Sequence, residues 1–283
     1  MSVFEGFLLG ILQGITEFLP VSSSGHLAVA QSLLGLDSVP ILFDVFLHLA
    51  TLTATIVFFR KKIWQLLCIF GRWITRRPDP VKEAITVDES DGLTGTESLG
   101  RKTIAAVIIA TVITGVIGVI TSHLIPELSV HFICVGFIIT AVMLVVSAYI
   151  EKRHAVSREK GISWKQALII GFAQGIGTLP GISRSGSTIA GGLVCGVDRT
   201  DAGEFSFIVS IPAILGAFIL ELKDIGDVQS SIGAAPVLAG CIAAAGFGYI
   251  ALTWLMKLIK KGRLEWFACY LIPLGVLGLL FLK

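Results

Sequence analysis

The residues that could do chemistry lie where proline, glycine and serine interrupt two apolar segments. The first interruption combines a carboxylate, three hydroxyls and a histidine, in the series Gln13, Glu17, Ser22, Ser23, Ser24, Gly25 and His26. Gln13 and Glu17 are four residues apart and therefore share one face of a short helix. A charge inside an apolar segment costs ~2.5 to 3.5 kcal/mol on insertion scales, so Glu17 needs a partner.

The second interruption supplies that partner, in the series Ser183, Arg184, Ser185, Gly186 and Ser187. Arg184 is the one basic residue placed inside an apolar segment, so we expect Glu17 and Arg184 to become neighbours. One interpretation is a structural ion pair. The other is an anion site, because serine-rich and glycine-containing turns that open helices present free N–H groups, and a guanidinium adds a fork for two phosphate oxygens.

Some of these residues also have a plainer interpretation. Each serine could be a helix cap, and His26 could be a buried structural histidine. Beside Glu17 and the serines, however, His26 is better interpreted as the acid, base or nucleophile of a phosphoryl transfer. Asp44, His48 and Glu204 are weaker candidates for supporting roles.

Composition identifies the surroundings as a lipid bilayer. Of 283 residues, 54% are hydrophobic and 15% are charged, which does not fit a water-facing surface. The net charge of +2 argues against disorder and nucleic-acid binding. The five cysteines are scattered without a CxxC pair, so neither a zinc site nor a disulfide framework is indicated. The apolar N-terminus lacks a basic region and a cleavage site, and we expect it to be retained.

We predict one all-α integral membrane domain over residues 1–283, with six transmembrane helices at 41–59, 103–122, 131–150, 203–222, 232–256 and 266–282. Three loops hold 18 of the 22 basic residues, the longest being a predicted cytoplasmic loop over 60–102. The connections near 123–127 and 223–227 are then predicted to lie outside. The interrupted segments, 6–36 and 165–197, contain helices of about 13 residues, too short to cross. We predict that they are re-entrant.

The two interrupted segments are copies of each other. With a shift of 161 residues, 9 of the 28 positions from 10 to 37 are identical, and Gly35 and Asp37 match Gly196 and Asp198. The helices that follow the copies are predicted to run in opposite directions, so the repeats, 6–60 and 165–222, are inverted. Inverted repeats with broken helices place a shared site near the membrane midplane.

These motifs resemble those of the undecaprenyl pyrophosphate phosphatase family, also called the bacitracin-resistance protein family. The resemblance covers the whole chain and rests on QxxxE at 13–17, PVSSSGH at 20–26, PGISRSGS at 180–187 and EFSF at 204–207. It implies a multi-pass enzyme of the plasma (inner) membrane that removes the terminal phosphate of a polyprenyl pyrophosphate. The product is the lipid carrier reused for cell-wall glycan synthesis.

The resemblance also implies roles for residues. Glu17, Ser23, His26 and Arg184 become the catalytic set, and the pyrophosphate is bound by Gln13, Ser22, Ser24, Gly25, Ser183, Ser185, Gly186 and Ser187. Either Ser23 attacks with His26 and Glu17 as its base, or His26 attacks and Glu17 activates water. A divalent cation, Mg²⁺ or Ca²⁺, is a further implication, with Glu17 as its ligand. Gln13 occupies a position held by Glu or Gln in the family, so a second carboxylate is absent.

A secondary transporter or flippase for a lipid phosphate or organic anion is the alternative, because transporters are also built from inverted repeats with broken helices. The expected partners are the polyprenyl pyrophosphate, the bilayer and a second copy of the chain in a homodimer.

Overall fold

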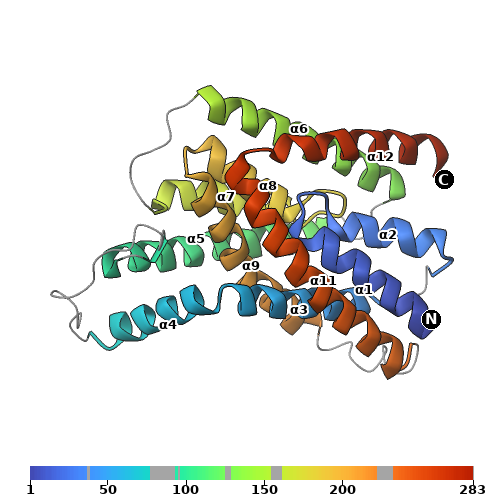
Figure 1. The fold of residues 1–283 in the computed structure, drawn as a ribbon, viewed down its shortest axis with the longest axis horizontal. Helices are drawn as coiled ribbons and strands as arrows, with labels where there is room; N and C mark the ends of the chain where they lie inside the picture. Colours follow the sequence, from blue (N-terminus) through green and yellow to red (C-terminus); the bar gives the residue numbers. More distant parts are fainter. Residues whose placement is uncertain are drawn as a thin grey trace.

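The computed structural model describes residues 1–36, 39–76, 93–94, 96–124, 129–153, 161–221 and 232–282, and none of these lies in a β-strand. Within them, six helical segments are long and apolar enough to cross a membrane, which confirms the six predicted spans. They are α3 (Ile41–Phe58), α5 (Glu97–Leu124), α6 (Val130–Arg153), α9 (Arg199–Glu221), α11 (Ala234–Lys261) and the pair η3 (Leu264–Phe267) and α12 (Ala268–Phe281). The chain is therefore an all-α, multi-pass membrane protein (Figure 1).

The two interrupted segments form two pairs of short helices. The first pair is α1 (Val3–Phe18) with α2 (Ser23–Leu33), and the second is α7 (Trp164–Ile176) with α8 (Arg184–Val194). At 1.5 Å per residue even α1 is only about 24 Å long, less than the hydrocarbon thickness. In Figure 1, α1 and α2 lie toward the end that holds both termini, and α7 lies in the opposite half. Re-entry from opposite membrane faces stays a prediction.

Repeated glycines let the first helix of each pair pack closely on a long helix. A Cβ added to Gly10 of α1 would lie 2.2 Å from the carbonyl oxygen of Gly240 in α11. A Cβ added to its repeat counterpart, Gly171 of α7, would lie 2.7 Å from Cα of Ala110 in α5. Both distances are below van der Waals contact. The repeated glycines of the internal repeat therefore serve the close packing of these helices and not the chemistry of the site.

The predicted cytoplasmic loop over 60–102 begins with a helix that the sequence analysis did not expect, α4 (Arg60–Ile74), and the placement of the loop in the cytoplasm stays a prediction. Leu66 and Ile69 are buried on one face of α4, while Trp64 is 68% exposed. An amphipathic helix of this kind has a lower mean hydropathy than a membrane span, so a search for long apolar stretches does not detect it. The rest of that loop at 77–92 and 95, the outer connections at 125–128 and 222–231, and Asp37 of the repeat lie outside the described residues.

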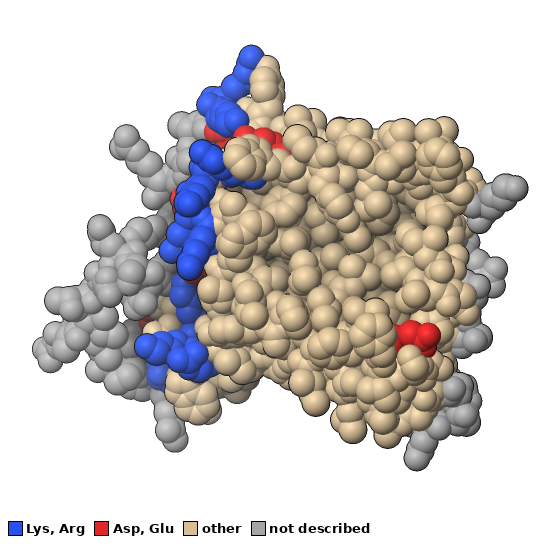
Figure 2. Space-filling view, turned by 45° about the vertical axis from the view of Figure 1, so that its right-hand side comes forward, with Lys and Arg blue, Asp and Glu red and all other residues tan. Residues whose placement is uncertain are grey.

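Charge is distributed unevenly along the molecule. Figure 2 shows the lysines and arginines of one face gathered in a band at one end, while most of that face carries no charged side chain. Exposed Ile, Leu, Val and Phe side chains are numerous on α5, α6, α11 and α12. A wide apolar belt bounded by a basic band is the surface expected of a protein surrounded by lipid.

Candidate active site

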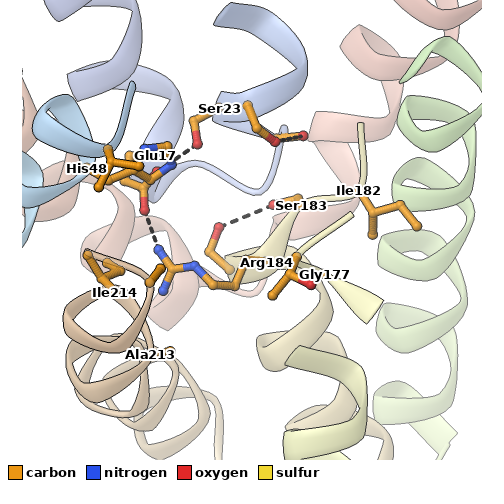
Figure 3. A pocket seen from close by; sticks show the side chains of 15 residues that line it. Glu17, Ser23, His48, Gly177, Ile182, Ser183, Arg184, Ala213 and Ile214 are labelled. Carbon is orange, nitrogen blue, oxygen red and sulfur yellow. Dashed lines mark hydrogen bonds and ion pairs between the residues drawn. The ribbon is translucent and has the colours of Figure 1, made fainter. Parts of the chain in front are cut away.

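The two helix pairs meet at a cavity of about 270 Å³. Figure 3 shows the side chains around it, which come from α1, α2, α3, α8, α9 and the breaks between the short helices. Its wall consists of Glu17, Ser22, Ser23, Ser24, Val45, His48, Gly177, Thr178, Ile182, Ser183, Arg184, Ser185, Ala213, Ile214 and Ala217. Seven of the predicted site residues thus share one cavity, although they are about 160 positions apart in the sequence.

Glu17 is the centre of the hydrogen-bond network, and it meets Arg184 as predicted. One carboxylate oxygen, Oε1, forms an ion pair with Arg184 Nη2. The other, Oε2, accepts hydrogen bonds from Ser23 Oγ at 2.6 Å and from Gln13 Nε2 at 2.9 Å. The side chain of Glu17 is only 4% exposed, and that of Arg184 is 18% exposed. Because the pair is so little hydrated, its charges interact far more strongly than they would in water.

His48 of α3 adds a second contact to the same carboxylate. Its Nε2 lies 3.4 Å from Glu17 Oε2, and its Nδ1 donates to the carbonyl oxygen of Asp44 at 2.7 Å. The Asp44 carboxylate itself accepts from Gln31 Nε2 at 2.8 Å and does not line the cavity. Of the weaker candidates, His48 therefore belongs to the cavity wall, whereas Asp44 and Glu204 do not; Glu204 is instead paired with Lys62.

A serine opens the second helix of each pair. Ser22 Oγ accepts from the backbone N–H of Gly25 at 3.3 Å, and Ser183 Oγ accepts from that of Gly186 at 3.0 Å. The positive ends of α2 and α8 therefore start at the cavity. Together with Arg184, two such helix ends favour an anion that carries several negative oxygens.

The cavity wall also relates the two repeats. With the shift of 161 residues, Glu17 corresponds to Thr178 and Ser23 corresponds to Arg184, and all four line the cavity. The copies thus place different chemistry at matched positions: acid and hydroxyl in one, hydroxyl and guanidinium in the other. Thr178 was missed by the sequence analysis, although this alignment could have identified it. The apolar wall from α3 and α9 had no sequence signal.

Five predicted site residues do not line the cavity: Gln13, Gly25, His26, Gly186 and Ser187. Gln13 is fully buried behind Glu17 and orients it. The two glycines allow close approach, since a Cβ on Gly25 would lie 2.7 Å from the Phe137 ring and one on Gly186 would lie 3.2 Å from Pro20.

His26 does not line the cavity. Its Nδ1 lies 2.7 Å from the carbonyl oxygen of Ser22, and its Nε2 lies 2.8 Å from the hydroxyl of Tyr270 in α12. Its ring packs between Phe137 and Tyr270, with centroid distances of 5.0 and 5.7 Å. Both nitrogens of the imidazole are therefore engaged by partners other than Ser23 and Glu17.

The side chains present do not fit a metal site built by the protein. The described part of the chain contains no group of three or more His, Cys, Asp or Glu that could hold a metal ion. Glu17 is the one carboxylate in the cavity wall, and both of its oxygens already accept from N–H or O–H donors. Mg²⁺ and Ca²⁺ prefer several oxygen ligands, so no step below is assigned to a metal.

Comparison with known proteins identifies the family of the chain. The sequence model of the family described as bacitracin resistance protein BacA matches residues 6–277. A protein of Treponema denticola named undecaprenyl-diphosphatase is 44% identical over 276 residues, covering 98% of this chain and 96% of the relative. Proteins of the same name from Methanobrevibacter smithii and Methanosphaera stadtmanae are 39% and 37% identical, covering 98% and 99% of this chain and 96% and 98% of theirs. The chain belongs to the bacitracin resistance protein BacA family.

Proposed function

We propose that the chain is a membrane phosphatase that hydrolyses undecaprenyl diphosphate to undecaprenyl phosphate and inorganic phosphate, as the name of its relatives indicates. The observation that carries the proposal is the meeting of Glu17, Ser23 and Arg184 at one cavity. In a phosphoryl transfer through a covalent intermediate, the hydroxyl can act as the nucleophile, the carboxylate as its base, and the guanidinium can stabilise the negative charge. The monophosphate product is the carrier form that cell-wall glycan synthesis reuses.

In the resting site Glu17 and Arg184 neutralise each other. A diphosphate brings more negative oxygens than one carboxylate, and it is oriented by the ends of α2 and α8, so it replaces Glu17 at the Arg184 fork. Glu17 then keeps its hydrogen bond from Ser23 and can accept that proton. Substrate binding itself thus releases the base.

Ser23 Oγ attacks the terminal phosphorus and its proton passes to Glu17. The bond from that phosphorus to the bridging oxygen breaks, and undecaprenyl phosphate leaves with the electron pair. Glu17 returns its proton to solvent. A water molecule then attacks the phosphoserine while Glu17 takes the water's proton, and Ser23 recovers its proton from Glu17 as inorganic phosphate leaves. Arg184 and the two helix ends stabilise the charge on the equatorial oxygens in both steps.

Attack by His26 is the less favoured version. Ser23 lines the cavity and is hydrogen-bonded to the base, whereas both nitrogens of His26 are occupied outside the cavity. The apolar wall formed by Val45, Ile182 and Ile214 adjoins the polar end and suits the first prenyl units. The remainder of the lipid lies in the bilayer, since the cavity is too small to hold it.

The basic band in Figure 2 supports an orientation in a plasma (inner) membrane with that end in the cytoplasm. Both termini lie at the opposite end in Figure 1 and are then outside. In this orientation we propose that the two helix pairs re-enter from opposite faces as inverted repeats. The homodimer stays a prediction. A dependence on Mg²⁺ or Ca²⁺ also stays a prediction, and the side chains of the cavity wall do not by themselves provide a site for either cation.

Phosphate release tests the function directly. A detergent solution is a single compartment, so transport across a membrane cannot be observed in it. Under these conditions a phosphatase releases inorganic phosphate from undecaprenyl diphosphate, whereas a transporter or flippase alone releases none. Mass analysis of an acid-quenched reaction should locate phosphate on Ser23. If the folded protein released no phosphate, either with or without added Mg²⁺ or Ca²⁺, the proposal would be contradicted.

A further inference from the structure

We propose that His26 and Tyr270 form a clamp that holds the break before α2 in the conformation that presents Ser23 to Glu17. His26 is then a positioning residue, and it takes no part in proton transfer or nucleophilic attack. The proposal rests on the proposed function, because it assigns a role within the same reaction. Three separate observations support it.

The first observation is the hydrogen-bonding state of the imidazole. A carbonyl oxygen can only accept, so the 2.7 Å contact with Ser22 requires that His26 Nδ1 carries a proton. In the neutral ring Nε2 is then an acceptor, and the hydroxyl of Tyr270 donates to it at 2.8 Å. Tyr270 therefore fixes the tautomer that clamps Ser22, much as second partners fix other functional histidines.

The second observation is the backbone of Ser22, the residue that is clamped. Ser22 has φ +68° and ψ +92°, and the one other described non-glycine residue with positive φ is Arg76. Side chains disfavour this conformation, so surrounding contacts must hold it. The Ser22 carbonyl receives two hydrogen bonds from His26, one from Nδ1 and one from the backbone N–H at 3.2 Å. Ser23 is the next residue, so the direction of its side chain depends on the conformation of this turn.

The third observation comes from the other repeat. With the shift of 161 residues, His26 corresponds to Ser187 and Ser22 corresponds to Ser183. Ser187 Oγ donates to the carbonyl oxygen of Ser183 at 2.7 Å, the same distance and the same acceptor position as in the first copy. A serine hydroxyl does not titrate near neutral pH, so in the second copy this bond has no acid–base role. His26 makes the equivalent bond with a different side chain.

The test uses this internal correspondence. His26→Ser restores a donor of the kind found in the second repeat, whereas His26→Ala removes the donor. Initial rates of phosphate release from undecaprenyl diphosphate are measured in detergent from pH 5 to 9, after the wild type has been shown to release phosphate. We expect His26→Ser to lose less than about tenfold in kcat, the scale of one net hydrogen bond. His26→Ala should lose more, and the pH profile of kcat should keep its shape in both.

General acid–base catalysis by His26 predicts otherwise. His26→Ser would then be as impaired as His26→Ala, by about a hundredfold or more, and one limb of the pH profile would vanish. That result, in protein whose melting temperature matches the wild type, would overturn the proposal. Phosphate trapped on His26 would do the same, in wild-type enzyme quenched at alkaline pH because phosphohistidine is lost in acid.

Tyr270→Phe provides a second, milder perturbation that leaves His26 in place. It removes the hydroxyl that fixes the tautomer, so we expect a several-fold lower kcat, little change in KM and an unshifted pH profile. In the His26→Ser background the same change should have no further effect, because the imidazole acceptor is gone. Tyr249→Phe on α11, away from the cavity wall, is the matched control. Equal losses from Tyr270→Phe in both backgrounds would refute the clamp.

Discussion

Replacing Glu17 by glutamine separates its role as a base from its role as the partner of Arg184. Glutamine keeps the length and an acceptor oxygen, but it cannot take the proton of Ser23, whose Oγ lies 2.6 Å from the carboxylate. Loss of a general base costs about 10²- to 10⁴-fold in rate. At 1.36 kcal/mol per factor of ten, the barrier rises by about 2.7 to 5.4 kcal/mol.

The same substitution should leave substrate binding intact or improve it. The carboxylate competes with the diphosphate for Arg184, and the two side chains are only 4% and 18% exposed, so water screens their attraction weakly. Without that competitor, Arg184 is available to the diphosphate. We therefore expect Glu17→Gln to lower kcat at least about a hundredfold while KM stays constant or falls.

Steady-state phosphate release over a range of undecaprenyl diphosphate concentrations gives both constants. Glu97→Gln is the matched control, because Glu97 is also paired with arginines, Arg72 and Arg101, but lies outside the cavity wall. Its kcat should remain within about twofold of the wild type, as expected for a distant surface pair. A Glu17→Gln enzyme with near-normal kcat and a raised KM would refute the reasoning, since Glu17 would then only bind substrate.

Three further outcomes follow from the same geometry. Arg184→Lys should raise KM at least about tenfold in the same assay, because an ammonium cannot bind two phosphate oxygens as a planar fork; an unchanged KM would contradict this. Gln13→Glu adds a second carboxylate beside the catalytic one, so rates in EDTA titrations should become more dependent on added Mg²⁺. Gly25→Ala should lower the melting temperature by an amount equivalent to about 1 to 3 kcal/mol, because its Cβ would lie 2.7 Å from the Phe137 ring, whereas Gly71→Ala, with nothing within 4 Å, should not.

The sequence predicted the main features of the fold because hydropathy over about 20 residues is a strong signal. It also predicted that Glu17 and Arg184 would meet. Each is a charge without a local partner inside an apolar segment, and the two segments are copies of each other that share one site. It missed α4, because an amphipathic helix has no long apolar run.

Individual roles at the site were less predictable. The serines, glycines and histidine of the two motifs are adjacent in sequence, yet only some of them face the cavity. Gly25 allows close packing, and His26 is directed toward Tyr270, a residue 244 positions later in the chain. His48 reaches Glu17 from another helix, and no local pattern connects the two.

The sequence alone therefore determined which side chains cannot rest in lipid without a partner, because burying a charge or a broken backbone in hydrocarbon is costly wherever it occurs along a chain. Only the tertiary structure decided the direction of each of those side chains. Direction depends on which neighbouring helix offers a donor, an acceptor or a ring at the right distance, as Tyr270 does for His26 and Arg184 does for Glu17.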